Sequence, residues 1–284
     1  MTFRTLTATA ALALSTSAAF AAGHAGNAGY ALANDGNTLV VMTDIAMPND
    51  VMTFDLANDL DAIAFRPVTG ELLGFAGDAI YTIDTSTGML TDLGATFMDD
   101  AMIADDAMVA FDFNNAIDAV RAVSSNGDNL VYFPEGFGDM DERAGSVLRF
   151  TDLAYAEGDA SFGAEPLVFA NAYTNAIAGM TAESTFQYAL DARANALISL
   201  ANNAGTLETI GLITIDGEAA DILPMGGFDI ISPSVGEDQA YAILQIDGQE
   251  TAGLYSIDLT SGNATLLSDL GMGGFSGFAA SMGM

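Results

Sequence analysis

A short unit recurs five times along this chain: an apolar strand, a tight polar turn and a second apolar strand. The five units begin at Tyr30, Leu73, Arg121, Tyr188 and Tyr241. Their starts lie roughly 40 to 70 residues apart, and a repeat of that length made of strands alone is typical of β-propeller blades. The repeat therefore predicts an all-β ring of blades.

Further apolar runs flank the units, and Gly and Asx residues separate them. The first unit has no strand before it, whereas the chain ends in a spare strand at 275–280. Pairing these N- and C-terminal strands would close the ring and remove its exposed edges. We therefore expect a β-propeller of five four-stranded blades: 22–56 with 275–281, 57–95, 105–150, 176–212 and 226–270. Residues 151–175 fit no blade, so six blades is the alternative, with a degenerate blade around 166–169.

The first residues have the pattern of a secretory signal. Arg4 precedes an uncharged, apolar and small-residue stretch at 6–20, and Ala19 to Ala21 form a small-x-small cleavage site. We expect a signal peptide at 1–21 and a single propeller domain at 22–284. No later apolar run is long enough to span a bilayer. The sequence predicts an exported protein, located in the periplasm or outside the cell, without membrane insertion.

Composition excludes several kinds of chemistry. The chain has no Cys, its six basic residues are all Arg, and its single His is His24, just after the expected signal. Thiolate metal sites, lysine Schiff bases and Ser–His triads are therefore excluded or very unfavourable. Against the six Arg stand 38 acidic residues, for a net charge of −32. Such a surface repels nucleic acid and anionic lipid, so neither is expected as a partner.

Several sequence runs, in order along almost the whole expected domain, resemble a known family. They are 30–35, 65–72, 111–114 with 121–129, 172–175, 203–207, 227–230 and 254–258. The chain resembles the family of exported bacterial propeller-like proteins called domain of unknown function 4394. It departs at Asn115, where the family usually has Pro, and in acidic inserts at 97–107 and 135–143. The resemblance implies the propeller fold and no established activity.

Alignment of the expected inner strands places polar residues near the axis of the ring. Asp112 and Asp229 share one position, with Ala64 and Ala279, and Arg66 and Asn114 lie two residues further on. One interpretation is a polar site for a cation or a sugar-like ligand. The other, which we favour, is that each Asp holds a blade corner through backbone N–H groups.

Two further groups of residues are candidates. Tyr173 and Asn175 lie in the unassigned segment, and loops on a rigid scaffold often carry binding residues. Carboxylates clustered in flexible loops suit Ca²⁺, and the candidate ligands are Asp99, Asp100, Asp105, Asp106, Asp139 and Asp141. Their spacing does not match a dedicated calcium loop, so general screening of a solvated acidic surface is the favoured alternative.

The function predicted from these features is a non-enzymatic binding or surface-interaction module for a glycan or protein ligand in the periplasm or outside the cell. No cofactor is expected other than the Ca²⁺ considered above. The alternative function is a carbohydrate-active hydrolase that uses Asp112 and Asp229 as paired carboxylates. The chain has no Trp to form an aromatic sugar platform, which weakens this alternative.

Overall fold

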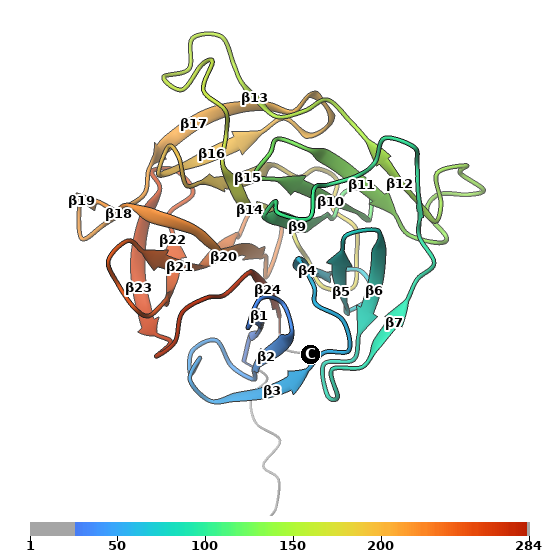
Figure 1. The fold of residues 1–284 in the computed structure, drawn as a ribbon, viewed down its shortest axis with the longest axis horizontal. Coiled ribbons are helices and arrows are strands. Elements are labelled where there is room, and N and C mark those ends of the chain that lie inside the picture. The colour runs from blue at the N-terminus through green and yellow to red at the C-terminus, as the bar shows by residue number, and fades with distance from the viewer. Residues whose placement is uncertain (1–25, 283–284) are drawn as a thin grey trace, which may run out of the picture.

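The computed structural model describes residues 26–282, so the expected signal peptide and His24 lie outside the described residues. Five sheets are arranged in a ring around a central axis (Figure 1). The innermost strands of the five blades pack against one another in a closed circle. They are β24 (Gly277–Ser281), β4 (Ala62–Arg66), β9 (Val109–Asn114), β14 (Val168–Tyr173) and β20 (Ile222–Ile231).

The remaining strands follow outward from these inner strands. The first blade adds β1 (Ala28–Ala33), β2 (Thr38–Met42) and β3 (Val51–Asp55), and the second adds β5 (Glu71–Ala76), β6 (Ala79–Ile83) and β7 (Leu90–Asp92). The third adds β10 (Ala119–Ser124), β11 (Asn129–Phe133), β12 (Ser146–Arg149) and β8 (Thr96–Phe97). The fourth adds β15 (Gln187–Asp191), β16 (Ala196–Leu200), β17 (Thr206–Leu212) and β13 (Ala154–Tyr155). The fifth adds β21 (Gln239–Ile246), β22 (Gly253–Ile257), β23 (Asn263–Asp269), β18 (Thr214–Ile215) and β19 (Glu218–Ala219).

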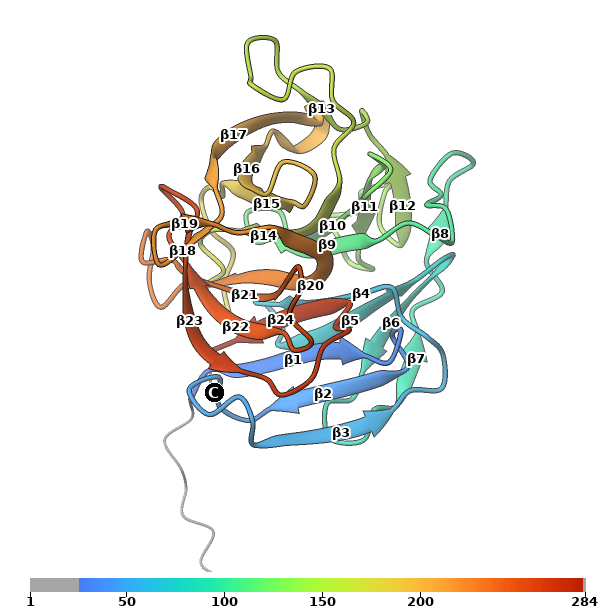
Figure 2. The ribbon, with the colours of Figure 1, turned by 60° about the vertical axis from the view of Figure 1, so that its left-hand side comes forward.

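The ring has five blades, as the repeat predicted, and its first blade is built from both ends of the domain. β24 lies beside β1 (Figure 2) and pairs with it antiparallel, so that Ala279 lies opposite Tyr30 and Phe278 opposite Ala31. A side chain at Gly227 would place its Cβ 2.3 Å from the backbone nitrogen of Phe278. Glycine there lets β20 and β24 pack closely where the chain closes.

Most of the core lies between neighbouring blades. All residues of β9, β10 and β11 are buried, because both faces of this sheet are covered. This explains why the strands read as nearly continuous apolar runs rather than alternating ones. Between the second and third blades, the rings of Phe75 and Phe111 lie 5.7 Å apart. Burying each such side chain contributes about 1.5–3 kcal/mol before chain entropy is counted.

The expected boundaries of the fourth blade were wrong. Its inner strand is β14 at 168–173, whereas 176–181, the strand expected there, belongs to a loop. Asn171 interrupts the apolar run of β14, and the segment from Ala176 to Thr181 resembles the true inner strand β4 more closely. The segment 151–175 therefore completes the fourth blade, and the six-blade alternative is wrong.

The strand count per blade also differs from the expected four in three blades. Residues leading into the third, fourth and fifth blades form β8, β13 and β18, which pair parallel to the outermost strands β12, β17 and β23. Each added strand covers a sheet edge that would otherwise present unpaired backbone groups. Among residues 26–282, no helix is long and apolar enough to cross a membrane.

Candidate functional site

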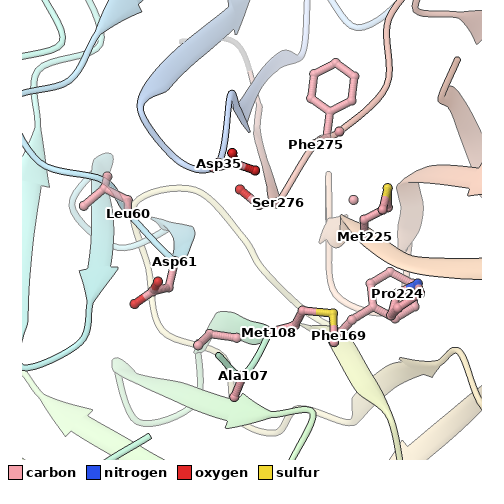
Figure 3. Close-up of a pocket in the computed structure, with 13 residues that line it drawn as sticks. Asp35, Leu60, Asp61, Ala107, Met108, Phe169, Pro224, Met225, Phe275 and Ser276 are labelled. Atoms are coloured by element: carbon pink, nitrogen blue, oxygen red, sulfur yellow. The ribbon is translucent and has the colours of Figure 1, made fainter. Parts of the chain in front are cut away.

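A pocket of about 300 Å³ opens at the end of the axis where the chain enters the inner strands (Figure 3). All five blades contribute to it, and we call it the mouth pocket. It is lined by Asp35, Leu60, Asp61, Ala107, Met108, Val109, Phe169, Pro224, Met225, Gly226, Gly274, Phe275 and Ser276. Because these residues come from loops and inner strands of all five blades, the pocket is held by the whole scaffold.

The walls of the mouth pocket are largely apolar, and its rim is acidic. Met108, Met225 and Phe169 contribute side chains to these walls (Figure 3). Asp35 and Asp61 lie exposed on the rim. Asp61 accepts the backbone N–H of Gly77 at 2.8 Å through Oδ2. The pKa of Asp61 is raised by its partial loss of hydration and by the charges of Asp105 and Asp59.

A second, narrow cavity of about 10 Å³, which we call the throat, borders the mouth pocket and shares Val109, Phe169 and Gly226 with it. Asn171 lines this throat and is only 1% exposed. Neither its Oδ1 nor its Nδ2 has a hydrogen-bond partner among the described residues. A buried amide without partners costs about 1–3 kcal/mol, so such a group calls for an explanation. Sequence analysis missed Asn171, although an amide inside an apolar strand was a usable signal.

Asp112 and Asp229 lie further along the axis, toward its other end. Asp112 accepts the backbone N–H of Tyr173 at 2.7 Å, and Asp229 accepts that of Ala280 at 2.6 Å. Asp229 also accepts the N–H of Ile230 at 2.6 Å. Both carboxylates thus bind backbone N–H groups, as our structural interpretation predicted, but those of Tyr173 and Ala280 belong to neighbouring inner strands and not to a blade corner. Each carboxylate thereby joins its own blade to the inner strand of the next one.

Both carboxylates line one small cavity of about 10 Å³, which has room for about one water molecule and none for a sugar ring. Burial raises the pKa of Asp229 to about 7. Burial, and then the charge of Asp229, raises the pKa of Asp112 well above its usual range. No Arg lines this cavity within the described residues. The pair is therefore suited to retaining a proton near neutral pH.

A loop from the fourth blade, residues 174–186, lies across this end of the axis, and we call it the plug loop. The N–H of Gly179 donates to Pro67 in the second blade, and that of Ala182 donates to Asn115 in the third. Ala176 accepts the N–H of Ser232 from the fifth blade. Ala176 also lines the cavity of the two aspartates. The plug loop thus covers the carboxylate pair.

Asn175 holds the plug loop in its conformation. Its φ is 57°, a left-handed value that Asn tolerates better than most residues. Its backbone N–H donates to Asp238, its Nδ2 donates to the carbonyl of Ser184, and its Oδ1 accepts the N–H of Gly236. These polar groups of Asn175, a predicted site residue, therefore make hydrogen bonds that hold the loop.

Arg66 and Asn114 also hold loops in place. Arg66 pairs with Asp118 at 2.5 Å and with Glu71 at 3.0 Å. Asn114 accepts the N–H of Ala116 at 3.0 Å and the hydroxyl of Thr185 at 2.9 Å. Both therefore already have partners near the turns that follow the inner strands.

Tyr173 is buried between the third and fourth blades. Its hydroxyl accepts from Nε of Arg121 at 2.8 Å and donates to Oε1 of Gln187 at 2.8 Å. The Arg121 guanidinium, itself 3% exposed, has only neutral oxygens as hydrogen-bond partners, including those of Asn129 and Asn203. Burial raises the pKa of Tyr173 to about 12. Tyr173 is thus part of an internal polar network and does not line the mouth pocket.

The structure does not gather the candidate calcium ligands. Within residues 26–282, no three Asp, Glu or His side chains converge to hold a metal ion. Asp141 pairs with Arg143 at 2.8 Å, and hydrogen bonds from Arg143 lower the pKa of Asp141 to about 2. In the loop that carries Asp99, Asp100, Asp105 and Asp106, the buried residues are Ala101 and Ile103. The loop is therefore attached to the core by apolar side chains.

Several solved bacterial structures are distantly similar to this chain. An auxiliary nutrient binding protein from Bacteroides ovatus is 14% identical, with a TM-score of 0.46, over 75% of this chain and 52% of that one. One from Bacteroides thetaiotaomicron is 10% identical, with a TM-score of 0.42, over 75% and 55%. This chain thus spans about half the length of either protein. A protein of unknown function from Bacteroides caccae is 8% identical, with a TM-score of 0.41, over 90% and 99%.

No curated protein matches the chain. One family profile does, and it covers residues 38–279, which is most of the described structure. The chain belongs to the family described as domain of unknown function 4394.

Proposed function

We propose that this protein is an exported, non-enzymatic binding module that takes a small organic ligand in the mouth pocket. The observation that carries the proposal is the pocket itself: about 300 Å³, lined by all five blades and bordering the throat that holds Asn171. Pockets that bind small ligands are commonly concave, mainly apolar and of this size or larger, with a few polar groups to orient the ligand.

The composition of the site favours binding over catalysis. The ionisable groups that line the mouth pocket among described residues are Asp35 and Asp61. The buried pair of Asp112 and Asp229 lies beneath the plug loop, in a cavity too small for a substrate. Export is supported by the charged start and the apolar stretch at 6–20. Mass spectrometry of the mature protein is expected to find an N-terminus near Ala22.

A pocket-filling variant tests the proposed site. Met225→Trp places a larger side chain into the mouth pocket, whereas Met89→Trp changes an exposed Met that does not line it. Metabolite mixtures are screened by thermal shift, and hits are measured by calorimetry. We expect the wild-type protein and Met89→Trp to bind the same ligand and Met225→Trp to lose it. Equal binding by folded Met225→Trp would contradict the proposal.

The hydrolase alternative makes a different prediction, which an activity assay on the same pocket variant tests. Turnover of a chromogenic glycoside panel should then survive Met225→Trp and disappear in Asp112→Asn or Asp229→Asn. We expect no turnover by the wild-type protein.

A further inference from the structure

We propose that the mouth pocket selects an organic cation: an ammonium group attached to an apolar body. This inference rests on the function proposed above and specifies the chemical class of its ligand. It follows from three features of one site, which are the charge of the rim, the character of the walls and the unpartnered amide in the throat.

The rim of the mouth pocket is negative, and no Arg among the described residues lines the pocket to neutralise it. Asp35 and Asp61 line the pocket, and the charges of Asp59 and Asp105 act on Asp61. A concave site lined by charges of one sign concentrates counter-ions and speeds their association. The whole chain adds to this field with a net charge of −32. An anionic ligand would meet repulsion at each stage of approach.

No Arg among the described residues lines the mouth pocket. Arg66, Arg143 and Arg149 are paired with carboxylates, and Arg121 is buried among neutral acceptors. Arg193 lines a separate pocket between the third and fourth blades. Positive charge at the mouth pocket therefore has to come from a ligand or from dissolved ions.

The walls favour a ligand with an apolar body over a bare metal ion. Leu60, Met108, Phe169, Met225 and Phe275 contribute apolar surface to the pocket. A hydrocarbon group that covers these walls removes apolar surface from water, which favours binding. Met side chains also adapt to ligands of different shape. A hydrated metal ion gains nothing from these walls. It also finds no three carboxylates in the described part of the chain that would replace its water shell.

Asn171 supplies a polar contact below the walls. Its Oδ1 and Nδ2 are buried and without partners among the described residues, in the throat that shares three lining residues with the pocket. A throat of about 10 Å³ admits roughly one water-sized group. An ammonium group is of that size, and it donates hydrogen bonds that the Oδ1 atom accepts, either directly or through one water. The amide thus gains a partner when the ligand binds.

Three probes of similar shape and different charge test the inference: phenethylamine, 2-phenylethanol and 3-phenylpropionate. Their affinities for the full mature protein are measured by calorimetry in dilute buffer and again at high salt. The rim variant is Asp35→Asn/Asp61→Asn. The matched control, Asp50→Asn/Asp139→Asn, removes the same charge from exposed residues that do not line the pocket and whose side chains make no hydrogen bond within the described chain. Thermal melting confirms that each variant is folded.

We expect phenethylamine to bind about ten-fold more tightly than 2-phenylethanol in dilute buffer, with 3-phenylpropionate weakest. Salt should narrow the difference because it screens the rim. The rim variant should bind phenethylamine with an affinity close to that for 2-phenylethanol. The control variant should change the affinity for phenethylamine less than two-fold.

The other outcomes separate the two proposals. If amine and alcohol bind equally and Met225→Trp abolishes both, the charge selectivity is wrong and the binding site stands. If the control variant weakens the binding of phenethylamine as much as the rim variant does, the protein's overall negative charge and not the rim selects the cation. The inference is then wrong. If none of the probes binds at millimolar concentration, or if folded Met225→Trp binds phenethylamine unchanged, the cation inference is wrong; the second result also contradicts the proposed binding site.

Discussion

Asp112 and Asp229 occupy equivalent positions in two blades that are not neighbours, and each hydrogen-bonds the inner strand of the blade that follows. Asp112 of β9 accepts the N–H of Tyr173 in β14, and Asp229 of β20 accepts the N–H of Ala280 in β24. The second of these contacts crosses the junction at which the ring closes. The two aspartates therefore act as inter-blade ties.

Substitutions of Asp112 separate the role of its hydrogen-bond acceptor from that of its negative charge. Asp112→Asn keeps an oxygen for the N–H of Tyr173 and removes a buried negative charge, so it should be at least as stable as the wild-type protein at pH 8. Asp112→Ala leaves that N–H without a partner, which should lower the free energy of unfolding by about 1–3 kcal/mol relative to Asp112→Asn. Urea unfolding measures both. Equal stability of the Asn and Ala variants would show that the hydrogen bond contributes nothing.

The same pair predicts a pH dependence of stability. The pKa of Asp229 is raised from 3.8 to about 7 in the folded protein, and that of Asp112 is raised in the same direction. The folded state therefore binds protons more tightly than the unfolded state. The stabilisation is fully present below pH 3.8 and is lost as the pH rises toward 7. With about 1.4 kcal/mol per pKa unit, the loss for Asp229 is on the order of 4 kcal/mol.

Other carboxylates also titrate over this range, so a control is essential. Asp112→Asn/Asp229→Asn removes both buried groups and leaves the surface charges in place. Unfolding free energies measured from pH 4 to 8 should fall more steeply with pH for the wild-type protein than for the double variant. Parallel curves would mean that the pair titrates normally.

The sequence predicted the ring and its closure because the repeat marks the second and third strands of each blade. Tyr30, Arg121 and Tyr241 align, and the residues that pair with them are Ala279, Asp112 and Asp229. The sequence alone therefore showed that the two aspartates are equivalent, although it did not show which groups they contact. Their burial under the plug loop could not be predicted, because part of that loop, 176–181, was expected to be the inner strand of the fourth blade.

The mouth pocket could not be predicted in the same way. Its lining residues, among them Asp35, Met108 and Phe169, come from separate loops and separate inner strands, and they share no motif or spacing. Only closure of the ring brings them together. Asn171 was missed for a related reason: its polar side chain made β14 look unlike the other inner strands, so the strand itself went unassigned.

Asn171 predicts a trade between stability and binding. Leu has a similar shape and no polar atoms, so Asn171→Leu removes a buried amide that has no partner among the described residues. The variant should be more stable than the wild-type protein, by about 1–3 kcal/mol in urea unfolding. It should also bind phenethylamine more weakly. A variant that is strongly destabilised, or one that binds as the wild-type protein does, would contradict the role assigned to Asn171.

The net charge of −32 predicts how ions affect the melting temperature. The Debye length falls from about 30 Å at 0.01 M salt to about 10 Å at 0.1 M, so repulsion between surface carboxylates weakens mainly at low concentration. NaCl should therefore raise the melting temperature smoothly, with most of the gain below 0.1 M. We expect millimolar Ca²⁺ and Mg²⁺ to do no more than NaCl matched for ionic strength.

Specific calcium binding would give a different result. A ligand bound only by the folded protein stabilises it by RT ln(1 + [L]/Kd), so Ca²⁺ would add a saturable increment at fixed ionic strength. Mg²⁺ would not match it, since that ion resists dehydration in irregular oxygen sites. The increment should then disappear in Asp105→Asn/Asp106→Asn if the ion binds the acidic loop at 97–107, or in Asp139→Asn if it binds beside Asp141. Because Asp141 already pairs with Arg143, we expect general screening alone.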